Sequence, residues 1–312
     1  RSAAMLSLLR LVLRLCFRFR AYNTAVLRTP GPVLLLPNHV SWFDWLLLGV
    51  CLEDDWRFVT SSTTAQASFL HRWIMTSSRT FPVDPLSPYA AKHMAEYLKT
   101  GGRLVLFPEG RISTTGSLMK LFDGTGFLLH HTQAKVITAY LRGAHRLPWS
   151  RNRDRKQLFP RVSAHFGDAL TPPALPPMST TAARNLRSDW LRDRMLEQRF
   201  RVEHAFGPRT LPEAIRATAR REPGKIALED ISGRLSYRRL FVGATLFARQ
   251  WRTLLAPGAE RVGVLLPNVN ATPLTLLSLW AVGKVPAILN YSTGPAIMLS
   301  CAQLAGLKQI VT

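Results

Sequence analysis

Short apolar runs recur along this chain, each followed by a polar loop or by a stretch with helical spacing. The clearest are 33–36 and 103–107, and the segments 136–141 and 161–166 are also predicted to be strands. A strand that is apolar on every side is buried on both faces, which is typical of a parallel sheet covered by helices. We therefore predict an α/β fold with a mixed or parallel sheet flanked by helices. Binding residues are expected at the carboxyl ends of its strands.

Helical patterns and proline-rich stretches divide the chain into two parts. A proline-rich segment, 171–177, closes the first part, and Gly207 and Pro208 mark a boundary after a charged helix. A second α/β unit begins there and continues for about 100 residues, which is short for a domain of this kind. Helices are predicted at 42–52, from Ser87 and Pro88 to Gly101, and at 180–202, 211–221 and 272–283, and further strands at 261–266 and 285–290.

The N-terminal segment predicts an amphipathic helix. Arg10, Arg14 and Arg18 recur every four residues, and a different face of the same helix carries the apolar side chains Leu6, Leu9, Leu13 and Phe17. Such a helix is suited to a membrane interface, with its apolar face in the lipid and its arginines among the phosphates. A helix that packs on the protein core is the alternative. Because the chain starts at Arg1 and not at methionine, we expect it to be part of a longer protein.

The charge of the chain points to an anionic partner. The 41 Lys and Arg residues against 19 Asp and Glu leave a net charge of +22. Such an excess attracts nucleic acid or anionic lipid. A basic cluster consists of Arg142, Arg146, Arg151, Arg153, Arg155, Lys156 and Arg161. No helix-turn-helix, zinc-finger or aromatic RNA-binding motif accompanies it, so we expect an anionic membrane surface or an acidic protein and no specific nucleic acid. Three scattered cysteines favour neither a disulfide framework nor a thiolate metal site.

A histidine and an aspartate form the first candidate catalytic pair. His39 follows the strand 33–36, and Asp44 lies five residues later. Two side chains at this spacing point away from each other on one continuous helix, but they can meet if His39 is in a loop and Asp44 in the first turn of a helix. Asp44 would then fix the imidazole tautomer, leaving His39 free to act as general base. On spacing alone, a structural histidine is the simpler interpretation.

A second polar loop follows the strand 103–107. It contains Glu109, Gly110 and Arg111. An arginine and backbone amides can bind a phosphate there, and a glutamate can bind a hydroxyl or a neighbouring base. A solvated turn with a surface ion pair is the alternative.

Together these segments resemble the glycerolipid acyltransferases, which include lysophosphatidate acyltransferase. The segments 38–44 (NHVSWFD) and 107–113 (FPEGRIS) correspond to the paired signature of that family, in the family's order and separation. A weaker intermediate block is matched by 79–84 and a late block by 136–141. In the late block Thr138 replaces the usual proline. In the segment 107–113, Arg111 and Ile112 replace the common Thr-Arg after the glycine. The resemblance implies the catalytic pair His39 and Asp44, with Glu109, Gly110 and Arg111 in the glycerophosphate-binding block.

The segment 109–120 is similar to one branch of this family, the bacterial bifunctional 2-acylglycerophosphoethanolamine acyltransferase/acyl-ACP synthetases. This branch implies transfer of an acyl group from an acyl carrier protein thioester to the 1-hydroxyl of a 2-acyl lysophospholipid, such as lysophosphatidylethanolamine. It implies no cofactor or metal for that step, and a location on the cytoplasmic face of a bacterial inner membrane. The alternatives are a 1-acylglycerol-3-phosphate acyltransferase and a basic nucleic-acid- or membrane-binding scaffold without catalysis.

The C-terminal unit supports the same branch. Residues 267–268 and the segments 274–283 and 285–291 resemble the opening portion of an adenylate-forming synthetase. Such enzymes use ATP and Mg²⁺ and bind the ATP phosphates with a Ser/Thr/Gly-rich loop that ends in Lys-Gly. No such loop occurs in the sequence between 207 and 312, so this chain is not expected to activate fatty acids. The predicted organisation is a membrane-interface helix and connector at 1–30, an acyltransferase domain at 31–206 and an incomplete adenylate-forming domain at 207–312.

Overall fold

The chain folds into two compact units, Arg1–Phe206 (unit 1) and Gly207–Thr312 (unit 2). The structure is a computed structural model that describes residues 3–61, 80–84, 87, 89–152 and 156–312.

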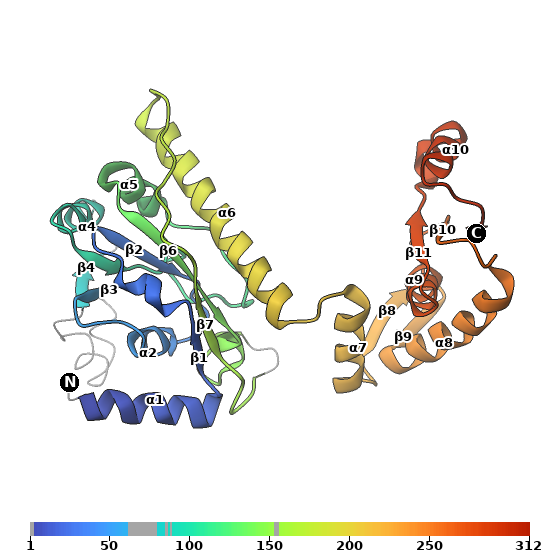
Figure 1. Cartoon of the computed structure of the whole chain (residues 1–312), viewed down its shortest axis with the longest axis horizontal. Helices are drawn as coiled ribbons and strands as arrows, with labels where there is room; N and C mark the ends of the chain where they lie inside the picture. Colours follow the sequence, from blue (N-terminus) through green and yellow to red (C-terminus); the bar gives the residue numbers. More distant parts are fainter. Residues whose placement is uncertain (1–2, 62–79, 85–86, 88, 153–155) are drawn as a thin grey trace. The chain divides into compact units, whose positions relative to one another are not determined.

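Unit 1 is built on a seven-stranded sheet, as counted over the described residues (Figure 1). Its strands are β1 (Arg20–Tyr22), β2 (Val33–Pro37), β3 (Trp56–Ser61), β4 (Thr80–Val83), β5 (Arg103–Val105), β6 (Lys135–Arg142) and β7 (Ser163–Phe166). They lie in the order β1-β7-β6-β2-β5-β3-β4, and all neighbours are parallel except β6 and β7. The predicted α/β fold with a mixed sheet is confirmed.

Helices cover both faces of this sheet, which is why β2 at its centre is wholly apolar. Val33 and Leu35 belong to one core cluster, together with residues of α1 (Ala3–Phe17) and α2 (Asp44–Gly49). Leu34 and Leu36 belong to the other cluster, together with residues of α4 (Ala90–Lys99), α5 (Asp123–Thr132) and α6 (Thr180–Phe206). These four side chains of β2 are fully buried, and Pro37 at its end is buried too. The short 3₁₀ helices of unit 1 are η1 (Thr24–Arg28) and η3 (Ala144–Arg146).

Several predicted helix bounds of unit 1 differ from the structure. The helix expected over 42–52 is shorter and spans Asp44–Gly49. The residues directly before Asp44 form a turn and not the first turn of a helix. The helix expected to start with Ser87 and Pro88 begins at Ala90; Ser87 Oγ accepts a hydrogen bond from the Tyr89 N–H, and Pro88 lies outside the described residues. Helix α5 was not predicted. Its sequence has two glycines and weak apolar periodicity, so its amphipathic signal is low.

The predicted N-terminal helix exists as α1, but its orientation corrects the sequence interpretation. The face expected to enter lipid packs on the protein: Leu13 and Phe17 are 2% and 7% exposed and belong to the core, and Leu9 packs against them. Arg10 is exposed, and its Nε donates to the Val50 carbonyl at 2.9 Å. A different apolar face is exposed, formed by Met5, Leu8, Leu11, Val12 and Leu15.

None of the described helices has both the length and the apolarity needed to cross a bilayer.

Unit 2 contains a short parallel sheet and a hairpin. The sheet has the order β11-β10-β12, formed by β10 (Arg261–Val264), β11 (Val285–Ile288) and β12 (Ile310–Val311). The hairpin pairs β8 (Ile226–Asp230) with β9 (Gly233–Ser236). The helices are α7 (Leu211–Arg221), α8 (Tyr237–Leu254), α9 (Ala271–Ala281), α10 (Pro295–Leu304) and the 3₁₀ helix η4 (Tyr291–Thr293). The predicted helix 211–221 has the same bounds as α7, while α8 and the hairpin were not predicted.

Candidate active site

The site is built on the turn that follows β2. Asn38 fixes the start of this turn to the neighbouring strand β6. Its N–H donates to the Ala139 carbonyl at 3.2 Å, and its Oδ1 accepts from the Leu141 N–H at 2.7 Å. A buried asparagine that bonds to a neighbouring strand in this way holds the next residue in one place. Sequence reasoning missed this role, although a polar residue directly after a wholly apolar strand was the available signal.

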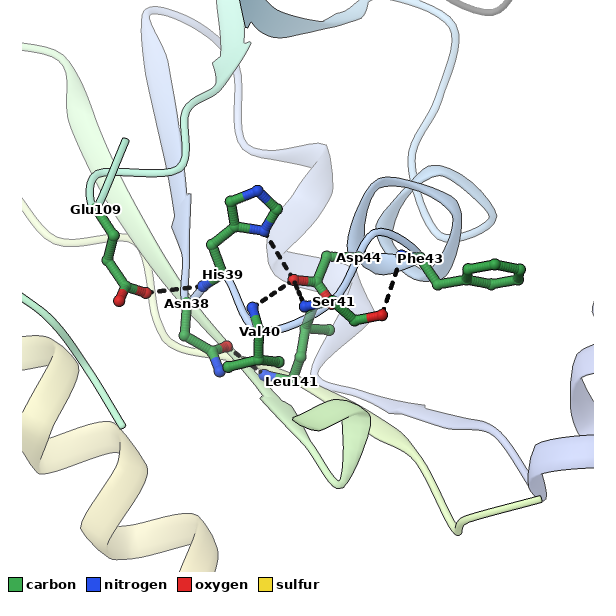
Figure 2. Close-up of polar contacts among 8 residues, drawn as sticks. All are labelled: Asn38, His39, Val40, Ser41, Phe43, Asp44, Glu109 and Leu141. Atoms are coloured by element: carbon green, nitrogen blue, oxygen red, sulfur yellow. Dashed lines mark hydrogen bonds and ion pairs between the residues drawn. The ribbon is translucent and has the colours of Figure 1, made fainter. Parts of the chain in front are cut away.

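His39 and Asp44 meet across this turn (Figure 2). His39 Nδ1 lies 2.9 Å from Asp44 Oδ2, and the same oxygen accepts from the N–H groups of Val40 at 2.6 Å and Ser41 at 2.9 Å. The chain therefore wraps around the carboxylate before α2 begins at Asp44. This wrap brings together two side chains that a continuous helix would hold apart.

The hydrogen bonds of Asp44 define the tautomer of His39. Because two backbone N–H groups already donate to Oδ2, this oxygen is an acceptor, and Nδ1 must donate to it. Burial raises the pKa of Asp44, whereas the hydrogen bond with His39 and those from Ser41 and Val40 act to lower it. In the described residues Asp44 Oδ1 is buried without a hydrogen-bond partner. In the neutral imidazole the proton is therefore on Nδ1, and Nε2 is left with a lone pair that can accept a proton from a substrate.

Three further contacts hold His39 in place. Its backbone N–H donates to Glu109 Oε1 at 2.8 Å, and its carbonyl accepts from the Ser113 N–H at 2.7 Å. Its ring stacks on Phe107, with the two centroids 4.0 Å apart. The imidazole side chain remains 20% exposed, and in Figure 2 the ring edge opposite Asp44 faces none of the residues drawn. The ring is thus rigidly oriented and still accessible.

Glu109 ties the two loops together. Oε1 accepts from the His39 N–H and Oε2 from the Met119 N–H, both at 2.8 Å. The residue is only 6% exposed, and burial raises the pKa of its carboxyl, while the hydrogen bonds from His39 and Met119 act to lower it. Both oxygens are engaged by backbone, so the geometry favours a positioning role for Glu109 over the direct substrate contact that the sequence suggested.

Gly110 and Arg111 lie at the surface beside Glu109. The Gly110 N–H donates to the Phe107 carbonyl at 3.1 Å, and its φ of 65° is in the left-handed region that favours glycine. Arg111 is exposed, and it makes no hydrogen bond or ion pair with any residue that the structure describes. Its guanidinium is therefore available to an anion from solution.

The other predicted segments have structural roles in the sheet. The late block 136–141 lies within β6, where Thr138 is buried and its carbonyl accepts from the Gly167 N–H at 2.8 Å. Of the intermediate block, Thr80–Val83 forms the edge strand β4, and Arg79 lies outside the described residues. Over the described part of the chain, no cluster of three or more His, Cys, Asp and Glu side chains could hold a metal ion.

The basic cluster predicted around 142–161 is partly engaged within the protein. Arg142 Nε forms an ion pair with Glu203 at 3.1 Å, Lys156 Nζ donates to the Pro148 carbonyl at 2.9 Å, and the Arg151 guanidinium lies over the Trp42 ring. Arg153 and Arg155 lie outside the described residues. Of the five described cations of this cluster, Arg142, Arg151 and Lys156 therefore contact other parts of the protein.

Part of unit 1 is similar to known acyltransferases. Residues 18–142, which include both His39 and Glu109, match the protein-family model described as Acyltransferase. The solved structure of the 1-acyl-sn-glycerophosphate (LPA) acyltransferase from Thermotoga maritima is similar at 15% identity and a TM-score of 0.47, over 62% of this chain and 78% of that chain.

Two further solved structures are similar to smaller parts of the chain. One is the N-terminal subdomain of NpsA from Klebsiella oxytoca, at 17% identity and a TM-score of 0.31, over 33% of this chain and 27% of that chain. The other is a benzoate CoA ligase from Burkholderia xenovorans LB400, at 25% identity and a TM-score of 0.29, over 32% of this chain and 20% of that chain. This chain thus spans only about a fifth of the ligase.

Proposed function

We propose that unit 1 is an O-acyltransferase that moves a fatty acyl group from an acyl carrier protein thioester to the 1-hydroxyl of a 2-acyl lysophospholipid, with lysophosphatidylethanolamine as the acceptor. The observation that carries this proposal is the oriented imidazole, whose Nδ1 is held by Asp44 while the ring stays accessible. The acyltransferase family match over 18–142 and the sequence motifs around Glu109 support it.

In the proposed reaction, His39 Nε2 accepts the hydroxyl proton as the hydroxyl oxygen attacks the thioester carbonyl carbon. The resulting tetrahedral intermediate then expels the thiolate, and the imidazolium returns its proton to the sulfur. Asp44 stabilises the imidazolium and keeps its orientation without taking the proton itself. No covalent acyl-enzyme is needed, because the two substrates react directly once they are bound together.

The exposed Arg111 is the residue that we assign to the acceptor phosphate. A guanidinium fork can bind two phosphate oxygens, and Arg111 has no competing carboxylate in the described residues. It lies two positions from Glu109, whose carboxylate binds the His39 backbone. An acceptor phosphate held there would bring the glycerol hydroxyl of the same molecule toward His39.

Unit 2 is proposed to be the beginning of an adenylate-forming domain. The segments 274–283 and 285–291 motivate this assignment, and they form most of α9 and all of β11. Transfer of an acyl group from a carrier thioester that is already formed consumes no ATP, so the proposed reaction of unit 1 should proceed without it.

The proposed donor and acceptor can be tested in one assay. The chain should be incubated with acyl carrier protein that bears a labelled acyl group, together with a panel of lysolipids, and the labelled phospholipids separated by chromatography. We expect product with 2-acyl lysophosphatidylethanolamine and unchanged yield when ATP is omitted. If lysophosphatidate were the only lysolipid that gave product, the proposed acceptor would be wrong. If product formed with acyl coenzyme A and not with acyl carrier protein, the proposed donor would be wrong.

We also propose that α1 attaches the protein to an anionic membrane surface. Its outward face carries Met5, Leu8, Leu11, Val12 and Leu15, and Leu8 and Leu15 are 61% and 71% exposed. Arg14 is also exposed, and it lies beside this face because it follows Leu11 by three residues, or nearly one helical turn. An apolar face beside a cation is the pattern of a helix that lies in the headgroup region.

Substitution of the outward leucines tests this attachment without disturbing the core. The variant Leu8→Ser with Leu15→Ser should sediment with anionic liposomes at least tenfold less than the wild type, since each leucine contributes about 2 kcal/mol when it is fully buried. The matched control replaces Leu186 and Phe200, which are exposed on α6, with serine. Equal loss of binding in both variants, or no loss in either, would contradict a specific role for α1.

A further inference from the structure

Unit 2 contains an open groove with an apolar floor and arginines at its edges. The groove, of about 520 Å³, lies between α7 and α8. Its floor includes Phe241, Val242 and Leu246, and both Val242 and Leu246 are more than half exposed. The arginines that line it are Arg216 and Arg220 on α7 and Arg238 and Arg249 on α8. No carboxylate lines the groove.

The four arginines have no partner within the described chain. The ion pairs of unit 2 are Lys225 with Glu222 and Arg234 with Glu229, and neither involves the groove. All four guanidinium side chains are exposed. Four uncompensated cations around an apolar floor repel one another, and an occupant with several negative charges and an apolar face would relieve this repulsion.

The spacing of the arginines indicates the length of the occupant. Arg216 and Arg220 are one helical turn apart on α7. Arg238 and Arg249 are eleven residues apart, so they lie on the same side of α8 and are separated by about 16 Å along its axis. That length corresponds to about three turns of a bound helix.

These features exclude two simpler occupants. A fatty acid has one carboxylate and would neutralise one of the four guanidinium groups. A flat lipid surface cannot fill a groove between two helices. We infer that the groove between α7 and α8 binds an acidic amphipathic helix of a partner protein. Such a helix would place apolar side chains on Phe241, Val242 and Leu246 and carboxylates beside the arginines.

The partner to which we assign this helix is the acyl carrier protein that delivers the acyl group. The identity of this partner rests on the proposed function of unit 1. The inference that the groove binds an acidic helix does not, because it comes from the residues of the groove. The probe is therefore purified acyl carrier protein with a fluorescent label and without an acyl group. Binding to the whole chain is followed by fluorescence anisotropy at low and at physiological salt.

Three variants separate specific docking from general attraction to a basic protein. Arg216→Glu with Arg220→Glu should weaken carrier binding on the order of tenfold or more. Val242→Ser with Leu246→Ser, which leaves the charge unchanged, should also weaken it. The control, Arg221→Glu with Lys308→Glu, changes the same number of charges outside the groove and should have a much smaller effect. Circular dichroism verifies that each variant is folded.

Two outcomes would overturn the inference: equal weakening by the control and the groove variants, or no carrier binding by the wild type at low salt. The variant His39→Ala distinguishes this inference from the proposed function. It should bind the carrier normally, because His39 lies in unit 1 and not in the groove. Full acyl transfer by His39→Ala would contradict the proposed function while leaving the carrier-binding result unaffected.

Discussion

Replacement of His39 by alanine should reduce acyl transfer by a factor of about 10² to 10⁴, which is the usual contribution of a positioned general base. The substitution removes Nε2, the proposed proton acceptor. It retains the backbone N–H and carbonyl through which residue 39 is bound to Glu109 and Ser113. The fold should therefore persist. The measurement is kcat/KM for the labelled acyl donor with a saturating lysolipid acceptor.

The matched control for this variant is His93→Ala. His93 is exposed on α4, away from the β2 turn in the sequence, and its removal should leave kcat/KM within a factor of about two. Liposome binding should be unchanged in both variants, because neither histidine belongs to the outward face of α1. If His39→Ala retained more than a tenth of the wild-type rate, the imidazole would not be the general base.

Replacement of Glu109 by glutamine should lower kcat by a factor of about 10 to 100, with little change in the KM for the lysolipid. Glutamine has one side-chain oxygen where glutamate has two. It can accept from either the His39 N–H or the Met119 N–H, and its amide nitrogen would then face the other donor. A buried N–H without an acceptor costs about 1–3 kcal/mol, so the two loops would separate and the imidazole would move.

The ratio of the two kinetic parameters decides between positioning and substrate binding for Glu109. Loss of a direct contact with the bound lysolipid would raise KM, whereas displacement of the base lowers kcat. A tenfold rise in KM at constant kcat would thus restore the substrate-binding role that the sequence suggested. The control is Glu96→Gln, an exposed residue on α4, which should alter neither parameter.

The sequence predicted the sheet and the contact between His39 and Asp44 because the signals are local. Val33, Leu34, Leu35 and Leu36 are apolar on both faces of a strand, and the structure buries all four. His39 and Asp44 are close in the sequence, so the geometry of a single turn determines whether they meet. The compact units divide after Phe206, beside the predicted boundary at Gly207 and Pro208. For features of this kind, spacing and residue type carry enough information.

The hydrogen-bond partners of Glu109 were decided by the tertiary structure alone. Glu109 bonds to a residue 70 positions away, and this contact depends on the parallel pairing of β2 with β5, which sets Leu35 opposite Val105. Register between distant strands comes from packing of the whole sheet, so no local pattern shows that both carboxylate oxygens are already engaged.

The sequence likewise did not predict which face of α1 packs on the core. The helix has two apolar faces, one with Leu9, Leu13 and Phe17 and the other with Leu8 and Leu15. Hydrophobicity along the chain predicts that a helix forms and that it is amphipathic, and the structure contains it as α1. Which face turns inward depends on where the rest of unit 1 leaves apolar surface to cover, and only the assembled core supplies that surface.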